Sequence, residues 1–311
     1  MFQILEIQKK AAALTFQQEC LAVAGKEDSG AIAEIFPLRD LSAVLIAEPA
    51  VSISGILMTE LAKKNIPLIF CDKRHLPSAS LSSLNITGYG KEQLIRTQCE
   101  ISKPFLKQCW KKLIRAKIHG QAAVLTQWRN SCLLDPLPDL IKTTNVDAIE
   151  SRAAVIYWKK LAIFNKRDRT AMDGNQFFNY AYTILYAAFA REIAVAGLLP
   201  RFGIHHHHRD NPYCLASDLM EPFRPWIDSI LIQCMQDLQL HPEQTITPAF
   251  KNALLKYIYA AKCRAGDNNI SFFSACRVSV ASYKQALIAA DHKIFKTLHW
   301  EVNNHVARCF F

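Results

Sequence analysis

The chain has 311 residues, half of them hydrophobic, and its formal net charge is +10 with a pI near 9.1. This length is enough for two domains, or one large domain, with a well-buried core. No run approaches the roughly 18 uninterrupted apolar residues of a membrane span, so we expect no membrane association. The excess of positive charge favours a polyanionic partner such as nucleic acid.

The ten cysteines occur singly and form no CxxC pair, which argues against a structural zinc site. The first ten residues have an acidic residue within their short apolar run and no small-residue cleavage site, so we expect no signal peptide. We therefore predict a cytoplasmic protein with reduced, mostly buried thiols.

Residues 1–80 have the pattern of a small β-rich domain. Short apolar runs that suit strands occur at 4–7, 20–23, 31–35, 43–46 and 66–71. Between the last two runs, residues 54–65 have apolar residues at helical spacing, with Ser52 or Ser54 as the expected N-cap. The charged residues 72–75, ending in His75, are interpreted as a turn after a strand rather than a catalytic cluster.

Residues 81–95 are predicted to link this domain to a larger one, because the chain from 76 to 90 is rich in Pro, Ser and Gly. From 96 to 311 the pattern becomes helical, and we predict an all-α second domain. Its expected helices include 105–125, 148–161, 176–196, 218–239, 249–265 and 274–295. The predicted fold class is α+β.

Two groups of basic residues lie in this helical part. Lys107, Lys111, Lys112, Arg115 and Lys117 are spaced around one predicted helix, and Lys166, Arg167 and Arg169 lie in a loop. Such spacing can line a phosphate-binding face. An ordinary solvated helix face explains it equally well.

The most distinctive stretch runs from 203 to 228. Its chemically notable residues are His205, His206, His207, His208, Arg209, Asp218, Glu221, Arg224 and Asp228. Imidazole and carboxylate groups at this density indicate a divalent metal site, and the arginines indicate an anionic ligand. The alternative is a solvated polar loop that precedes a helix.

A second carboxylate is set apart by its helix face. Glu150 shares one side of a predicted helix with Ala153, Ala154 and Tyr157, where it would be partly buried and would need a cation. Taken alone, a surface or capping role for Glu150 is the simpler interpretation.

Several motifs together carry a family resemblance. They are Asn179-Tyr180-Ala181-Tyr182, Gly197-Leu198-Leu199-Pro200, Gly203-Ile204-His205-His206, Leu215 to Pro225, and Ala43 to Pro77. With these motifs the chain resembles the CRISPR-associated endonuclease and integrase of the spacer-acquisition complex, in its type II form. The resemblance implies a β-rich N-terminal domain, an all-helical catalytic domain, a homodimer, and assembly with a small CRISPR-associated partner protein.

The resemblance also implies a metal site that holds Mg²⁺ or Mn²⁺. Its catalytic and metal-binding residues would be Glu150, His206 and Glu221, with His205 as the alternative histidine and Asp218 in support. His207 and His208 go beyond the two histidines usual in the family, and we expect them to face solvent or DNA. Residues 118–120 stand where an Asn is expected before Gln121.

The implied function is insertion of new spacer DNA into a CRISPR repeat array by 3′-hydroxyl transesterification on double-stranded DNA. The expected DNA contacts are Arg209, Arg224, Lys107, Lys111, Arg115, Lys166, Arg167 and Arg169. Two other functions remain open: a catalytically silent DNA-binding scaffold of the same complex, and a metal-dependent hydrolase of a small substrate.

Overall fold

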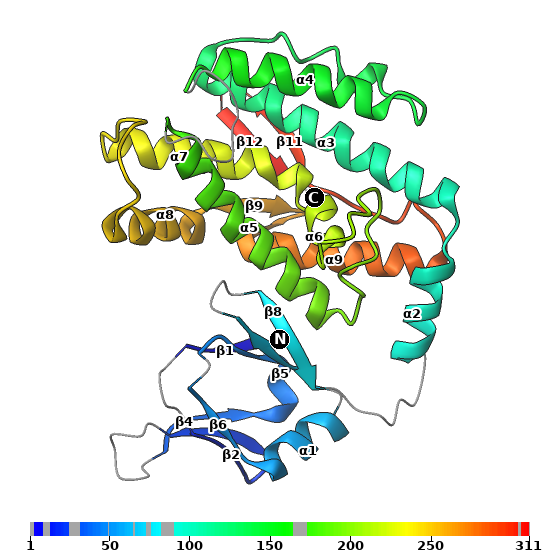
Figure 1. The fold of residues 1–311 in the computed structure, drawn as a ribbon, viewed down its shortest axis with the longest axis vertical. Helices are drawn as coiled ribbons and strands as arrows, with labels where there is room; N and C mark the ends of the chain where they lie inside the picture. Colours follow the sequence, from blue (N-terminus) through cyan, green and yellow to red (C-terminus); the bar gives the residue numbers. More distant parts are fainter. Residues whose placement is uncertain are drawn as a thin grey trace. The chain divides into compact units, whose positions relative to one another are not determined.

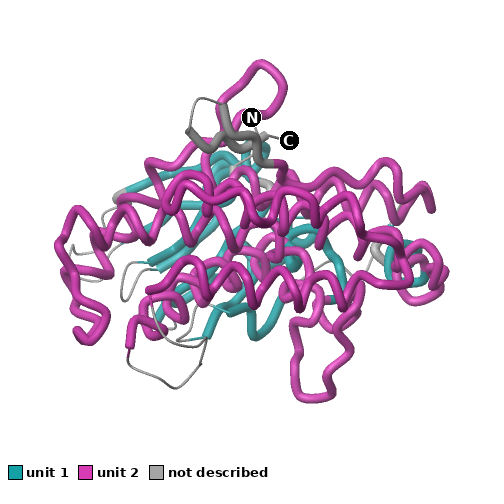
Figure 2. Tube along the Cα trace, turned by 90° about the horizontal axis from the view of Figure 1, so that it is seen from above, with its two compact units in different colours: residues 1–96, 193–199 teal, residues 97–192, 200–311 magenta. Residues whose placement is uncertain are grey.

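The computed structural model describes residues 3–8, 13–24, 32–48, 50–64, 66–72, 76–81, 90–163, 173–303 and 306–310. The chain divides into two compact units (Figure 2). Unit 1 comprises residues 1–96 and 193–199, and unit 2 comprises residues 97–192 and 200–311. His75 and the loop residues Lys166, Arg167 and Arg169 lie outside the described ranges.

The described residues of unit 1 form two four-stranded sheets and the whole of one α-helix, and the unit also includes a short 3-10 helix and the ends of two helices that continue into unit 2 (Figure 1). The first sheet has the order β1 (Gln3–Ile7), β5 (Leu41–Ile46), β7 (Leu68–Cys71) and β8 (Pro77–Leu81). The second has the order β4 (Ile32–Pro37), β3 (Cys20–Ala24), β2 (Ala13–Gln17) and β6 (Ser52–Ile53). A short 3-10 helix, η1 (Leu38–Asp40), precedes β5. Helix α1 (Gly55–Lys63) begins at Ser54, whose side chain accepts a hydrogen bond from the backbone N–H of Leu57.

The central strands β5 and β7 of the first sheet are buried on both faces, which explains their continuous apolar runs. Val44, Ile46 and Leu68 face a core that is shared with α1 and the second sheet. Leu45 and Ile69 point the other way, onto a smaller cluster that includes the end of α5. Because successive strand residues alternate between faces, a run without polar residues suits a sheet covered on both sides.

Unit 2 is built around the long helix α3 (Lys103–Arg129), which begins at the N-cap Ser102 with Pro104 in its first turn. Helix α2 (Lys91–Glu100) precedes it. The other helices are α4 (Val146–Leu161), α5 (Asn175–Val195), α6 (Cys214–Leu219), α7 (Arg224–Asp237), α8 (Pro248–Ala260) and α9 (Phe272–Ala289), with the 3-10 helices η2 (Pro138–Leu140) and η3 (Glu221–Phe223). Helix α3 packs against α4, α7 and η3 (Figure 1).

The α+β class is confirmed, but the second unit is mostly helical rather than all-helical. A four-stranded sheet has the order β10 (Asn268–Ser271), β9 (Lys262–Ala265), β12 (Val306–Phe310) and β11 (His299–Asn303). The predicted helix 249–265 ends five residues earlier, and β9 and β10 form a hairpin around Gly266, which has a φ of +58°. These short strands have little periodicity of their own; they pair with each other, and β9 also pairs with the distant strand β12 at Arg264 and Phe310.

None of the helices in the described ranges combines the length and hydropathy of a transmembrane span.

Candidate active site

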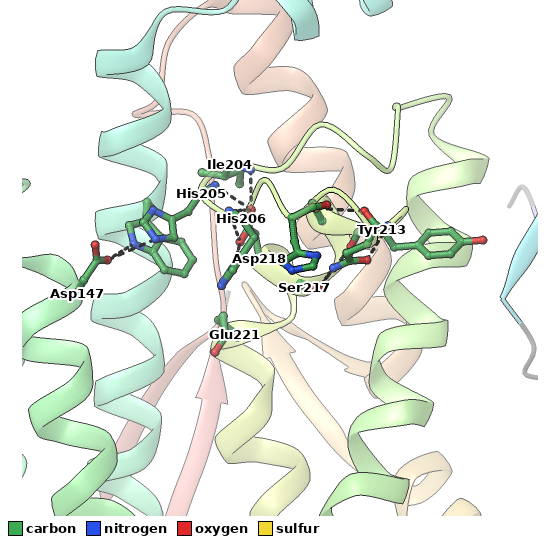
Figure 3. Close-up of polar contacts among 12 residues, drawn as sticks. Asp147, Ile204, His205, His206, Tyr213, Ser217, Asp218 and Glu221 are labelled. Carbon is green, nitrogen blue, oxygen red and sulfur yellow. Dashed lines mark hydrogen bonds and ion pairs between the residues drawn. The ribbon is translucent and has the colours of Figure 1, made fainter. Parts of the chain in front are cut away.

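The buried carboxylate of Asp218 organises the loop that carries the histidines (Figure 3). Its Oδ2 atom accepts hydrogen bonds from the backbone N–H groups of Ile204 at 2.6 Å and His205 at 2.9 Å. Gly203 is required at the start of this loop, since an added Cβ would lie 2.3 Å from the carbonyl oxygen of His206 and 2.8 Å from Oδ2 of Asp218. Asp218 therefore holds the loop backbone against α6.

The side chain of His206 is held by the same carboxylate. Its Nδ1 atom contacts Oδ1 of Asp218, and the ring is about half exposed. The hydrogen bond with Asp218 raises the pKa of His206 above its usual value, although partial burial opposes the charged form. The negative charges of Glu221 and Glu150 contribute in the same direction. With Nδ1 engaged, Nε2 is the ring nitrogen left for another partner.

His205 is held differently, by an aromatic stack. Its ring lies flat on that of Trp110, with centroids 4.3 Å apart, and its Nε2 atom is 3.6 Å from Oδ1 of Asp147. The indole N–H of Trp110 donates to the same carboxylate oxygen at 3.0 Å. His207 and His208 are exposed. The two candidate histidines of the sequence thus differ in their surroundings, and His206 is the one on a buried carboxylate.

Glu150 and Glu221 come together around the ammonium of Lys117. The Nζ atom of Lys117, on α3, lies 2.5 Å from Oε1 of Glu150 on α4 and 2.7 Å from Oε2 of Glu221 on η3. The exposed fractions of the three side chains are only 12% for Lys117, 23% for Glu150 and 7% for Glu221. Two carboxylates from distant parts of the chain therefore share one cation, Lys117, although its spacing in the sequence predicts a place on a basic helix face.

Arg224 forms a second ion pair with Glu221. Its Nε atom is 3.0 Å from Oε1 of Glu221, and its guanidinium lies over the ring of Tyr182, 4.8 Å from the centroid. Burial opposes ionisation of Glu221, but Arg224 and Lys117 outweigh it and lower the pKa of the carboxyl. Burial likewise opposes the charge on Lys117, yet Glu221 and Glu150 raise the pKa of its amine. The lowered pKa of Glu221 and the raised pKa of Lys117 both favour the charged forms of this ion pair.

Asp228 is the centre of a second buried network. The carboxylate, 1% exposed, accepts hydrogen bonds from the hydroxyls of Tyr157 at 2.8 Å and Tyr182 at 2.7 Å. Sequence reasoning singled out Asp228 by its residue type but assigned no role to either tyrosine. A buried carboxylate needs hydrogen-bond donors, so Asp228 calls for hydroxyl groups nearby. The sequence feature that could have identified one donor is Tyr157, which lies on the same helix face as Glu150.

The basic residues of α3 have separate roles. The amine of Lys112 donates to the carbonyl oxygen of His292 at 2.8 Å and to those of Lys293 and Phe295, and Arg115 pairs with Asp139 at 2.5 Å. Lys107 is exposed, Lys111 is partly exposed, and Arg209 is exposed in the histidine loop. The basic residues of α3 therefore do not form one common surface, although they lie along one helix.

In their present positions, the described side chains contain no group of three His, Cys, Asp or Glu residues that could hold a metal ion. Lys117 fills the position between the two carboxylates, and His206 faces Asp218 through Nδ1. The donor set nevertheless fits a divalent cation, since carboxylate oxygens and an imidazole nitrogen suit Mn²⁺ and Mg²⁺. Oε2 of Glu221 is buried, and its contact in the described structure is the ammonium of Lys117 at 2.7 Å.

Comparison with known proteins places this chain and its fold in a defined class. The family model of the CRISPR associated protein Cas1 matches residues 5–260. The CRISPR-associated endonuclease Cas1 of Neisseria meningitidis serogroup C (strain 8013) is 31% identical over 229 residues, covering 72% of this chain and 73% of that protein. CRISPR-associated endonuclease Cas1 1 of Francisella tularensis subsp. novicida (strain U112) is 29% identical over 275 residues, covering 78% and 84%.

Solved structures share the fold. A casposase bound to an integration product superposes with a TM-score of 0.71 and 16% identity, covering 95% of this chain and 99% of that one. A chain of a partial Cas6-RT-Cas1–Cas2 complex gives a TM-score of 0.71 and 18% identity, with coverage of 96% and 98%. The fold is thus that of Cas1 proteins and casposases. On the family match, the chain belongs to the CRISPR-associated Cas1 family.

Proposed function

We propose that this protein is a metal-dependent DNA endonuclease and integrase that inserts new spacer DNA into a CRISPR repeat array. The main support is the convergence of Glu150 from α4 and Glu221 from η3 on a single cation beside His206. The relatives described above are named endonucleases, and one structural neighbour is a casposase bound to an integration product.

The proposed ligands of Mg²⁺ or Mn²⁺ are Glu150, Glu221 and Nε2 of His206. Metal-binding histidines commonly donate their other ring nitrogen to a carboxylate, and Nδ1 of His206 faces Asp218 in this way. This contact favours His206 over His205, whose ring is stacked on Trp110. When bound, the ion would polarise a phosphoryl oxygen and stabilise the charge that develops on it.

The proposed reaction is attack by a 3′-hydroxyl of the incoming DNA on a phosphodiester of the array. A new oxygen–phosphorus bond forms, the bond from phosphorus to the 3′ oxygen of the array strand breaks, and that oxygen takes up a proton to leave as a 3′-hydroxyl. Water in place of the incoming hydroxyl would cut the DNA instead. Within the chain, Arg224 fixes Glu221 and Asp218 orients His206.

The proposed partners follow from charge and from the structural neighbours. We propose that the protein acts in the cytoplasm, in the type II form of the system, as a homodimer with a small CRISPR-associated partner protein. The neighbours include a Cas1–Cas2 complex and a Cas1–DNA complex. Lys107, Lys111 and Arg209 are available to contact DNA phosphates because each is at least partly exposed.

The test combines the protein and its small partner with Mn²⁺, a short duplex with free 3′ ends and a supercoiled plasmid carrying a repeat array. Strand-transfer products are expected, and Glu150→Gln or Glu221→Gln should lower their yield by roughly 100-fold or more. Glu243→Gln, at an exposed position, serves as the control.

Three results would contradict the proposal. Absence of any product with the unmodified protein would exclude an integrase under these conditions. Unchanged insertion by both Glu150→Gln and Glu221→Gln would mean that these carboxylates are not catalytic, as expected if this chain is a silent scaffold and its partner carries the activity. Failure to bind DNA at low salt would favour a hydrolase of a small substrate.

A further inference from the structure

Lys117 lies in the middle of the proposed metal site. Its ammonium contacts Oε1 of Glu150 and Oε2 of Glu221 at 2.5 and 2.7 Å, and it comes from α3 rather than from either carboxylate-bearing element. Helix α3 packs against both α4 and η3, so the position of the ammonium is set by the core of unit 2. The contacts of Lys117 with the two carboxylates therefore belong to the packed interior of unit 2 and differ from an ion pair on the surface.

We infer that Lys117 is the internal counter-cation of this site: it holds Glu150 and Glu221 together in the metal-free protein and gives up these contacts to the divalent cation. This inference rests on the function proposed above. It makes Lys117 a positioning residue whose charge competes with the metal.

The competition follows from geometry and charge. Carboxylate oxygens bind Mg²⁺ at about 2.0–2.1 Å, so an ion held by Glu150 and Glu221 would use the space and oxygens that the ammonium now occupies. Two cations would repel each other strongly in such a poorly solvated place. The flexible four-carbon stem of lysine allows the ammonium to withdraw.

The rest of the site is arranged to stay in place during this exchange. Arg224 binds Oε1 of Glu221, the oxygen that Lys117 does not contact, so the carboxylate remains anchored when Lys117 leaves. Without either cation between them, Glu150 and Glu221 would be two poorly solvated negative charges in close proximity. Lys117 should therefore stabilise the metal-free protein and weaken its affinity for metal.

The test is Lys117→Met, which keeps an unbranched side chain of nearly the same length and removes its charge. Two quantities are measured without DNA: the Kd for Mn²⁺, from the electron paramagnetic resonance signal of free Mn²⁺, and the Tm in EDTA and in Mn²⁺. Compared with the unmodified protein, Lys117→Met should have a lower Tm in EDTA and a Kd for Mn²⁺ that is lower by about 10-fold or more. Its Tm should also rise further when Mn²⁺ is added. Lys256→Met, at an exposed position on α8, should change none of these.

A double variant keeps the test decisive if Lys117→Met folds poorly. Adding Glu150→Gln removes the negative charge left uncompensated, so the double variant should recover most of the Tm that Lys117→Met loses in EDTA. Strictly additive losses, or a double variant that also fails to fold, would overturn the inference, because the defect would then lie in lost packing.

The results also separate this inference from the proposed function. If the unmodified protein and Lys117→Met bind Mn²⁺ with equal affinity, or the variant binds more weakly, Lys117 does not compete with the metal and only this inference fails. If neither protein binds Mn²⁺, the metal-dependent function is contradicted and the inference fails with it.

Discussion

The imidazole of His206 contacts the carboxylate of Asp218 through its Nδ1 atom. Asp218 has no solvent exposure, whereas the ring of His206 is about half exposed. Asp218 is fixed from the other side by the backbone N–H groups of Ile204 and His205. One ring nitrogen is therefore anchored in the protein interior, and the other is presented at the surface of the site. This is the geometry that a metal-binding histidine needs.

Asp218→Asn should disturb this arrangement with little change in shape. An amide N–H₂ facing Nδ1 would make that nitrogen an acceptor and place the proton on Nε2, where it blocks a metal. We expect the Kd for Mn²⁺ to rise by about 10- to 100-fold, with a parallel loss of strand transfer. Mn²⁺ titration measures the first effect, and Asp210→Asn in the exposed part of the loop is the control. Wild-type affinity in Asp218→Asn would show that the tautomer of His206 is unimportant.

Gly203→Ala should destabilise unit 2. The added methyl group would meet the carbonyl oxygen of His206 at 2.3 Å and Oδ2 of Asp218 at 2.8 Å, so the loop has to shift. We expect the free energy of unfolding to fall by about 1–3 kcal/mol, as for other overpacked sites. Urea unfolding curves provide the measurement. Gly55→Ala is the matched control, because nothing lies within 4 Å of its new Cβ and α1 begins there. Equal stability of the two variants would contradict the prediction.

Glu192 should make stability depend on pH. Burial raises the pKa of this carboxyl above 4.5, and Arg277, whose Nε is 3.4 Å away, and Arg191 offset only part of the effect. The folded protein then binds more protons than the unfolded chain between 4.5 and the raised pKa, so this contribution to stability is lost as pH rises through that window.

Removing the charge with Glu192→Gln should therefore give a protein more stable than wild type near neutral pH, with the difference shrinking towards about pH 4. The difference in Tm between variant and wild type, measured across this range, tests the sign. Glu92→Gln, whose side chain is 73% exposed beside Arg96, should show no such trend. A Glu192→Gln variant less stable than wild type at neutral pH would mean that the ion pair with Arg277 dominates.

Lys107 and Lys111 should contribute to DNA affinity through phosphate contacts. They are one turn apart on α3, and neither is enclosed as Lys117 is. The affinity for DNA falls as salt concentration rises, and each phosphate contact contributes about −0.9 to the slope of log affinity against log salt concentration. Changing both lysines to Ala should therefore make this slope less negative by about two. Binding isotherms at several salt concentrations measure this slope, and Lys256→Ala is the control. An unchanged slope would place the DNA elsewhere on the protein.

Long periodic segments were the most predictable part of the fold. The expected helix 176–196 corresponds to α5 (Asn175–Val195), which is followed by Gly197 with a φ of +75°. Such a helix can be predicted from local sequence, because its apolar periodicity and the glycine that ends it involve residues close together in the chain. Strands β9 to β12 were missed because each has only four or five residues, and their two local hairpins join into one sheet only where β9 pairs with the distant β12.

The family resemblance carried by the motifs pointed to Glu150, Asp218 and Glu221 as acidic groups of one proposed site, whereas residue types alone favoured a surface or capping role for Glu150. In the structure Glu150 and Glu221 do meet, at Lys117. The sequence was not sufficient to assign partners. Lys112 and Lys117 have the same chemistry and lie five positions apart, yet one binds carbonyl oxygens after α9 and the other binds two carboxylates. Likewise, adjacent histidines differ because Trp110 stacks on one and Asp218 holds the other.

The stretch from 203 to 228 contains the histidines, Asp218 and Glu221, and the packing of α3, α4, α6 and η3 brings Lys117 and Glu150 to them. The physical reason is that desolvation, hydrogen bonds and ion pairs depend on neighbours from other elements, which have no fixed spacing in the sequence.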